Sequence, residues 1–173
     1  SDAQDSIFSD RCSRCELGLI SARGRFAAAL AIGDGRSRSA SLAMSDVKER
    51  LDDITKPDQD ERSYRHLLLR NELSVLLVSD GNADKAAAAM DVAVGSASDP
   101  EEFPGLAHFC EHMSFLGTEK YPREEDFSGF LSSHGGSTNA YTDQEDTVYY
   151  FDISADFLDD ALDRFSQFFI SPT

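Results

Sequence analysis

Residues 105–121 read GLAHFCEHMSFLGTEKY, and at their centre His108, Glu111 and His112 form the pattern H-x-x-E-H. On a helix, residues four apart lie on the same face, so both imidazoles can reach one ion. Imidazole nitrogens bind zinc at about 2.0–2.1 Å. Glu111 directly precedes His112, so its carboxylate can take a proton from a water that the same metal activates. The sequence therefore predicts one Zn²⁺ with His108 and His112 as ligands and Glu111 as the catalytic base.

The flanks of this motif predict a helix over residues 103–116. Pro104 suits the first turn of a helix, and Gly117 suits the position after its end. Apolar residues recur at helical spacing between them: Leu106, Phe109, Met113 and Leu116. This pattern predicts an apolar stripe and a buried helix that carries polar ligands. The alternative is a pair of surface histidines on an acidic helix.

Short apolar runs separated by turn residues predict an α+β fold for the rest of the chain. Strands are expected at 64–69, 73–78, 86–94, 137–142 and 147–153, and further helices after Pro122 and at 155–170. Their order predicts a sheet with helices packed on one face. We expect Ser154 to cap the last helix and the folded part to begin near Lys56 and Pro57.

The charge of the chain is strongly negative and unevenly distributed. The 173 residues carry 32 acids against 16 Lys and Arg, for a net charge of −16. Residues 1–45 hold six Arg and five acids, a net +1, so residues 46–173 carry −17. So acidic a body disfavours nucleic acid and anionic membranes as partners, and it fits either basic or neutral peptides or a plain solvated surface. No apolar run reaches the roughly 18 residues of a membrane span.

Residues 1–45 differ from the remainder in being dominated by Ser, Ala, Arg and Gly. We expect a disordered or leader-like extension there and a folded domain over 46–173. Six arginines between Arg11 and Arg38 face only two acids, which is typical of transit peptides. Cys12 and Cys15 form a C-x-x-C that could be half of a zinc site, a redox pair, or two reduced thiols. Three cysteines, an odd number, do not make a secreted disulfide framework, which favours an intracellular protein.

Several stretches together resemble the M16 metallopeptidases, most closely their insulysin-type members. H-x-x-E-H is itself the pattern of the inverted zinc peptidases. The resemblance runs from about Tyr64 to the end and includes residues 105–121, HGGSTNA at 134–140 and ALDRF at 161–165. Ser114 departs from it, since the family usually has an aliphatic residue there. On this resemblance, residues 46–173 are the N-terminal part of an M16 peptidase domain that is C-terminally incomplete.

The resemblance implies a zinc-dependent metalloendopeptidase that cleaves short flexible peptides and forms a homodimer in its full-length form. It also implies a cytoplasmic protein with minor mitochondrial targeting by residues 1–43. The family takes a glutamate as third zinc ligand from a helix further along than Thr173, so we expect this chain alone to be inactive. His134, Glu145 and Asp146 are the residues within the chain that could replace that ligand.

The family binds its substrate as a strand added to the sheet edge beside the zinc. By this resemblance Asn139, Ala140 and Tyr141 bind the peptide, and Phe115 with Tyr150 lines a hydrophobic pocket beside the cleavage point. From the residues alone, these are an ordinary edge strand and ordinary core aromatics. Two other functions stay open, namely a non-catalytic peptide-binding fragment and a processing-peptidase-like subunit that needs a partner chain.

Overall fold

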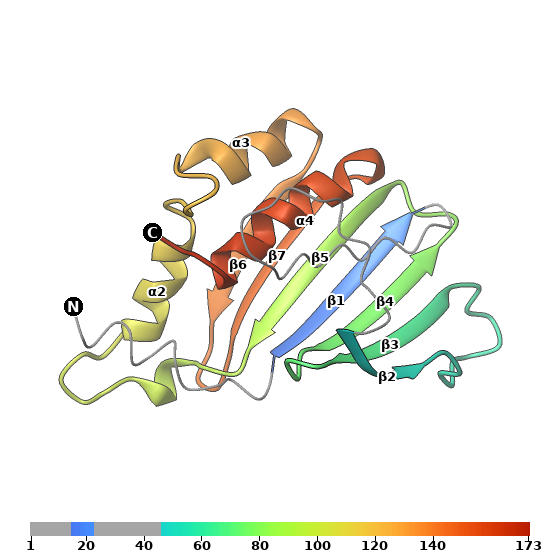
Figure 1. Ribbon diagram of the computed structural model, residues 1–173, viewed down its shortest axis with the longest axis horizontal. Coiled ribbons are helices and arrows are strands. Elements are labelled where there is room, and N and C mark those ends of the chain that lie inside the picture. The colour runs from blue at the N-terminus through green and yellow to red at the C-terminus, as the bar shows by residue number, and fades with distance from the viewer. Residues whose placement is uncertain (1–14, 23–45) are drawn as a thin grey trace.

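One seven-stranded sheet with helices on a single face makes up the part of the chain that the computed structural model describes, residues 15–22 and 46–173 (Figure 1). The strands, in chain order, are β1 Cys15–Ala22, β2 Val47–Leu51, β3 Ser63–Leu69, β4 Ser74–Asp80, β5 Lys85–Val92, β6 Ser137–Thr142 and β7 Thr147–Ser154. The α-helices are α2 Leu106–Ser114, α3 Glu125–Ser133 and α4 Leu158–Ser166. Single 3-10 turns lie at η2 Ser96–Ser98, η3 Ala155–Phe157 and η4 Gln167–Phe169. The predicted α+β class, with helices packed on one face, is confirmed.

The strand order across the sheet is β2-β3-β4-β1-β5-β7-β6. Neighbouring strands are antiparallel except for β1 and β4, which run parallel. The five strands expected from the sequence are β3 to β7. The expected start near Lys56 is wrong, because β2 already pairs with β3 at 47–51.

Within the predicted extension, residues 15–22 form β1, where no regular structure was expected from the sequence. It lies between β4 and β5 in the middle of the sheet (Figure 1). Residues 1–14 and 23–45 lie outside the described residues, as does Cys12 of the C-x-x-C. The boundary at residue 45 therefore stays a prediction.

The core forms where the inward side chains of β5 and β7 meet α3 and α4. Along β7 the residues alternate between buried and more exposed, so Tyr149, Phe151 and Ile153 all face the helices. On α4, Leu158, Ala161, Leu162 and Phe165 recur at helical spacing and are all buried. Edge-to-face ring contacts of 5.1–5.7 Å join Phe151 to Phe165 and to Phe127 of α3. These contacts place the helix layer firmly over β7, which is next to the site.

Two local predictions are wrong, each for a physical reason. Ser154 does not cap the last helix, because its hydroxyl donates to the carbonyl of His134 instead. The apolar stripe of α2 does not make a buried helix. Phe109 is 60% exposed and Leu116 44% exposed, while the buried residue of α2 is Glu111. The helix thus turns its acid toward the sheet and part of its apolar surface outward.

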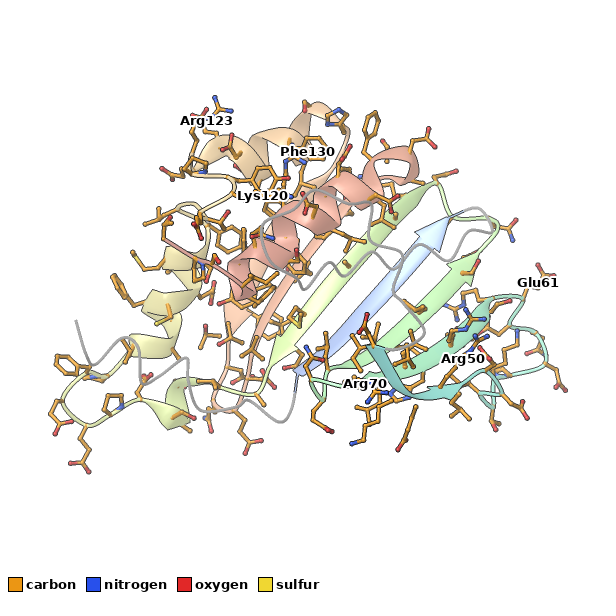
Figure 2. The ribbon with its side chains drawn as sticks, viewed as in Figure 1. Arg50, Glu61, Arg70, Lys120, Arg123 and Phe130 are labelled. Carbon is orange, nitrogen blue, oxygen red and sulfur yellow. The ribbon has the colours of Figure 1, made fainter. Side chains whose placement is uncertain are left out.

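The two edges of the sheet differ in chemistry. Edge strand β2 presents Lys48 and Arg50, and charged side chains crowd that end of the molecule in Figure 2. Charge of this kind protects an edge against pairing with another strand. Edge strand β6, Ser-Thr-Asn-Ala-Tyr-Thr, carries none. Among the described residues, no helix is long and apolar enough to cross a bilayer.

The start of β6 depends on the close approach of Gly136 to β7. A Cβ there would lie 2.1 Å from the carbonyl oxygen of Asp152, whereas a Cβ at Gly81 would meet nothing within 4 Å. We expect Gly136→Ala to lower the free energy of unfolding by about 1–3 kcal/mol, as overpacking does. Gly81→Ala is the control and should change it by less than about 1 kcal/mol. Equal effects of the two substitutions in urea denaturation would contradict the prediction.

Candidate active site

Helix α2 brings His108, Glu111 and His112 together, as the sequence predicts. The Nε2 atoms of the two histidines lie 3.0 Å apart. One ligand atom from each of the three residues falls within 4.8 Å of the others. Both imidazoles are exposed, and the carboxylate between them is only 7% exposed. The helix thus presents two accessible nitrogen ligands beside a sheltered acid.

The donor set fits zinc. Two nitrogens 3.0 Å apart can both bond one ion at about 2.0–2.1 Å, because their separation is less than twice that bond length. Neutral imidazole is a common zinc ligand, and zinc accepts carboxylate oxygen as well. In the described part of the chain, these three residues are the only group of metal-ligating side chains close enough together to hold one ion. His134, Glu145 and Asp146 do not belong to it, so the structure does not support them as replacements for a third ligand.

The Glu111 carboxylate points toward the sheet and is held there by a hydroxyl. Thr142, the last residue of β6, donates from Oγ1 to Glu111 Oε2 at 2.6 Å. This contact joins two segments that are 31 residues apart in the chain. It also fixes the end of β6 against the helix that carries the histidines.

The N-terminus of α2 is capped from the preceding loop. Asp99 accepts the backbone N–H of Gly105 at 2.6 Å and that of Ala107 at 2.8 Å, one with each carboxylate oxygen. Gly105 has a φ of 88°, a left-handed conformation that suits glycine. A carboxylate at this end of a helix satisfies free N–H groups and complements the helix dipole. Asp99 therefore sets where the helix begins, and with it the position of His108.

Ser114, the residue that departs from the family pattern, is accommodated by hydrogen bonds. Its hydroxyl donates to the carbonyl of Cys110 at 2.9 Å, so the hydroxyl of Tyr149, 3.4 Å away, is the donor in their contact. Burial raises the pKa of Tyr149, which keeps this phenol protonated. Burial, followed by the charge of Asp99, raises the pKa of the half-buried Cys110 thiol. Cys110 thus behaves as a packing residue.

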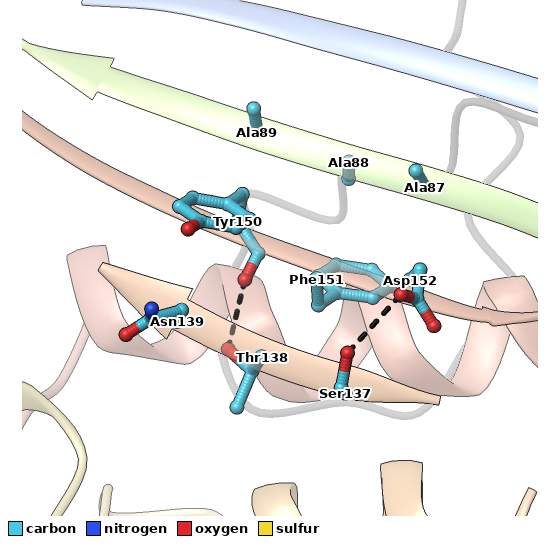
Figure 3. A pocket seen from close by; sticks show the side chains of 9 residues that line it. All are labelled: Ala87, Ala88, Ala89, Ser137, Thr138, Asn139, Tyr150, Phe151 and Asp152. Atoms are coloured by element: carbon cyan, nitrogen blue, oxygen red, sulfur yellow. Dashed lines mark hydrogen bonds between the residues drawn. The ribbon is translucent and has the colours of Figure 1, made fainter. Parts of the chain in front are cut away.

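The predicted substrate residues lie on and beside edge strand β6. Asn139 and Tyr141 are exposed and share the open face of the sheet with Tyr150, which pairs with Asn139 in register. A shallow hollow of about 460 Å³ opens on that face beside them, with the alanines of β5 on its other side (Figure 3). Ala140 turns its side chain to the helix face, where it packs against the core.

Phe115 and Tyr150 do not line one pocket as the resemblance implied. Phe115 lies on the helix face, with its ring 6.1 Å from that of Tyr149 and 5.1 Å from that of Phe168. Tyr150 follows Tyr149 in the strand and therefore points to the opposite face. The sheet itself separates the two side chains, so this expectation is corrected.

Thr142 and Asp99 are site residues that sequence reasoning missed. Strand alternation could have placed Thr142 on the same face as Ala140, and Asp99 before Pro100 is a usual helix-start residue. Neither signal shows that Thr142 reaches Glu111 or that Asp99 reaches α2. Those contacts depend on how distant segments pack.

A helix with H-x-x-E-H set against a sheet edge is the arrangement of the inverted zinc peptidases. The family model described as Insulinase (Peptidase family M16) matches residues 74–173, and the chain belongs to this family. It is 58% identical over 119 residues to insulin-degrading enzyme of Homo sapiens, covering 69% of this chain and 12% of that protein. It is 55% identical over 120 residues to the A-factor-processing enzyme of Saccharomyces cerevisiae, again covering 12% of the relative.

Among solved structures, the chain is similar to pitrilysin, with a TM-score of 0.69 and 42% identity. That match covers 72% of this chain and 13% of the pitrilysin chain. The chain thus spans about an eighth of the length of the relatives it matches. The family and the fold are shown over this part.

Removal of the α2 cap provides a test of the site's scaffold. We expect Asp99→Ala to lower the free energy of unfolding by about 0.5–2 kcal/mol, because two backbone N–H groups lose their acceptors. Glu101→Ala, which removes an exposed acid from the same loop, is the control. Denaturation with urea measures both, and equal stabilities of the two variants would contradict the capping role.

Proposed function

We propose that this protein is a zinc-dependent endopeptidase of the M16 family and that it cleaves short, flexible peptides. The observation that carries the proposal is the pair of Nε2 atoms 3.0 Å apart, with the sheltered Glu111 between them. Membership of the family supports it. A relative from Schizosaccharomyces pombe, 55% identical over 116 residues, is named a zinc protease.

In this proposal each of the three site residues of α2 has one role. His108 and His112 would hold zinc, which as a Lewis acid would lower the pKa of a bound water to about 7. Glu111 accepts the proton of the attacking water and then delivers it to the leaving amine. Catalytic zinc sites usually have three protein ligands, and the resemblance predicts a glutamate as the third. That ligand stays a prediction, as does the inactivity of the chain when alone.

The substrate would bind as a strand added to β6. The N–H of Ala140 donates to the side-chain oxygen of Asn139 at 2.9 Å rather than to β7, so it points to the outer side of the sheet. An extended peptide can take over this N–H and pair with the uncharged edge. Backbone pairing is indifferent to sequence, so it suits a peptidase that accepts many flexible peptides. Asn139, Ala140, Tyr141 and Tyr150 are the proposed substrate residues, whereas Phe115 packs against Tyr149 and Phe168 on the helix face.

A second candidate function is peptide binding without cleavage. The edge strand is complete in this chain, whereas two histidines and one glutamate leave the metal centre open. A peptide could therefore pair with β6 even where no hydrolysis follows. The processing-peptidase-like subunit, the homodimer and the absence of nucleic acid and membrane partners stay predictions. The cytoplasmic location with minor mitochondrial targeting by residues 1–43 also stays a prediction.

Zinc content and hydrolysis of a quenched fluorescent peptide test the first proposal. We expect Glu111→Gln in the intact gene product to abolish cleavage while stoichiometric zinc is kept, because the substitution removes the base and leaves both imidazoles. His108→Phe should lose zinc and cleavage together. The same assays on the 173-residue chain should show weak zinc binding and no cleavage. Cleavage that survives Glu111→Gln would refute the assigned role.

A single substitution tests the binding edge. Ala140→Pro removes the outward N–H, and proline is tolerated in edge strands where no ladder bond is lost. We expect peptide binding, measured by fluorescence anisotropy, to weaken at least tenfold while zinc content is unchanged. Ala83→Pro, in the β4–β5 turn remote from β6, is the control. Unchanged peptide affinity in Ala140→Pro would exclude β6 as the binding strand.

A further inference from the structure

The carboxylate of Glu111 has a specific partner that no part of the proposed mechanism uses. Thr142 Oγ1 lies 2.6 Å from Glu111 Oε2. An ionised carboxylate only accepts hydrogen bonds, so the hydroxyl proton of Thr142 points at Glu111. Because Glu111 is 7% exposed, water can replace this donor only in part. The contact therefore restricts where the carboxylate can lie.

A second threonine lies beside Thr142 and fixes the strand that carries it. Thr147, the register partner of Thr142 across the β6–β7 hairpin, is 4% exposed. Its hydroxyl lies 2.8 Å from the carbonyl oxygen of Val94 and 3.3 Å from Thr142 Oγ1. The single hydroxyl proton of Thr147 goes to the nearer acceptor, the carbonyl of Val94, and this hydrogen bond anchors Thr147. Thr142 is thus placed by strand β6, whose pairing partner Thr147 is fixed to Val94.

The segment 94–99 contacts both the β6–β7 hairpin loop and the start of helix α2. Its backbone N–H groups at Ser96 and Ala97 donate to Asp143 and Gln144 of the hairpin loop at 2.9 and 2.8 Å. A Cβ at Gly95 would lie 2.4 Å from the Asp143 carbonyl oxygen, so only glycine allows the loop to approach so closely. Asp99, at the end of the segment, caps α2. One short segment therefore fixes the strand that carries Thr142 and the helix that carries Glu111.

We propose that Thr142 is a positioning residue for the peptidase reaction, which holds the Glu111 carboxylate in the orientation needed to accept the proton of the attacking water. The inference rests on the proposed function. Thr142 contacts neither imidazole among the described hydrogen bonds, so its role is separate from holding zinc. Partners of this kind, one step removed from a metal site, typically change activity 10–100-fold when they are lost.

Three variants of Thr142 and Glu111 in the intact gene product test this role. Thr142→Val keeps the shape and removes the hydroxyl, Thr142→Ser keeps the hydroxyl, and Glu111→Gln removes the base. We expect Thr142→Val to lower kcat about 10–100-fold with KM and zinc affinity within about twofold of wild type. Thr142→Ser should keep kcat within about threefold of wild type. Crystal structures of the zinc-loaded variants should show the Glu111 carboxylate displaced in Thr142→Val and in place in Thr142→Ser.

Thr118→Val is the matched control for loss of stability. Thr118 is 2% exposed, and its hydroxyl oxygen accepts the backbone N–H of Tyr121 at 3.1 Å, away from Glu111. Thr118→Val should lower the free energy of unfolding, measured by urea denaturation, about as much as Thr142→Val does, while kcat is unchanged. A fall in kcat in Thr118→Val equal to that in Thr142→Val would mean that stability alone explains the effect and would overturn the inference.

The remaining outcomes separate the inference from the proposed function. Wild-type kcat in Thr142→Val, alongside loss of cleavage in Glu111→Gln, overturns the positioning role and leaves the peptidase proposal standing. An equal fall in kcat in Thr142→Val and Thr142→Ser shows a structural role and overturns the inference. Loss of zinc in Thr142→Val does the same. A wild-type protein without Glu111-dependent cleavage refutes the proposed function, and the inference falls with it.

Discussion

The burial of the Glu111 carboxylate between α2 and β6 is the constraint on which the rest of the site depends. Removing a carboxylate from water is costly unless hydrogen bonds replace those it loses. Here the hydroxyl of Thr142 is such a partner, and it can reach Glu111 only if the helix lies against the end of β6. The capped start of α2 and the docked hairpin loop both serve that placement, since each is held by segment 94–99. The two exposed imidazoles are then set at the edge of the sheet.

This placement explains why α2 departs from ordinary amphipathic packing. A helix normally buries its apolar stripe, but α2 buries an acid and leaves Phe109 60% exposed. Natural proteins break such local rules mainly at functional sites, where chemistry rather than burial decides the orientation. Other elements provide the apolar burial that α2 lacks, because α3, α4 and η4 supply the aromatic cluster that covers β7. The site helix can therefore be oriented for its ligands while other helices supply most of the core.

The two sheet edges show the same division of roles. Charged β2 is protected against pairing, and uncharged β6 offers an outward N–H on the edge next to the proposed metal ligands. Only one edge of the sheet is thus suited to receive an extended peptide, and it is the edge next to Glu111. The proposed metal chemistry and the proposed binding mode meet at Thr142, which ends β6 and contacts the base.

Local patterns in the sequence were enough to predict the class of fold, strands β3 to β7, the α-helices of the described residues, and the grouping of His108, Glu111 and His112 on one helix. These features depend on spacing along the chain, namely alternation in strands and a four-residue repeat in helices. Patterns failed where a competing partner decided the outcome. The hydroxyl of Ser154 donates to the backbone carbonyl of His134 instead of capping the helix, and Phe115 is separated from Tyr150 by the sheet. β2 was missed because its exposed, charged residues lack the alternation that marks a half-buried strand.

The sequence by itself determined that two imidazoles and a carboxylate lie close together, since H-x-x-E-H groups them on any helix that it forms. The tertiary structure alone decided which side of that helix is buried, which strand lies beside it and which hydroxyl holds the base. The physical reason is the separation along the chain of the residues that make each contact. A helix brings residues four apart into contact wherever it lies, whereas the contact of Glu111 with Thr142 spans 31 residues and exists only once the helix has packed against the sheet.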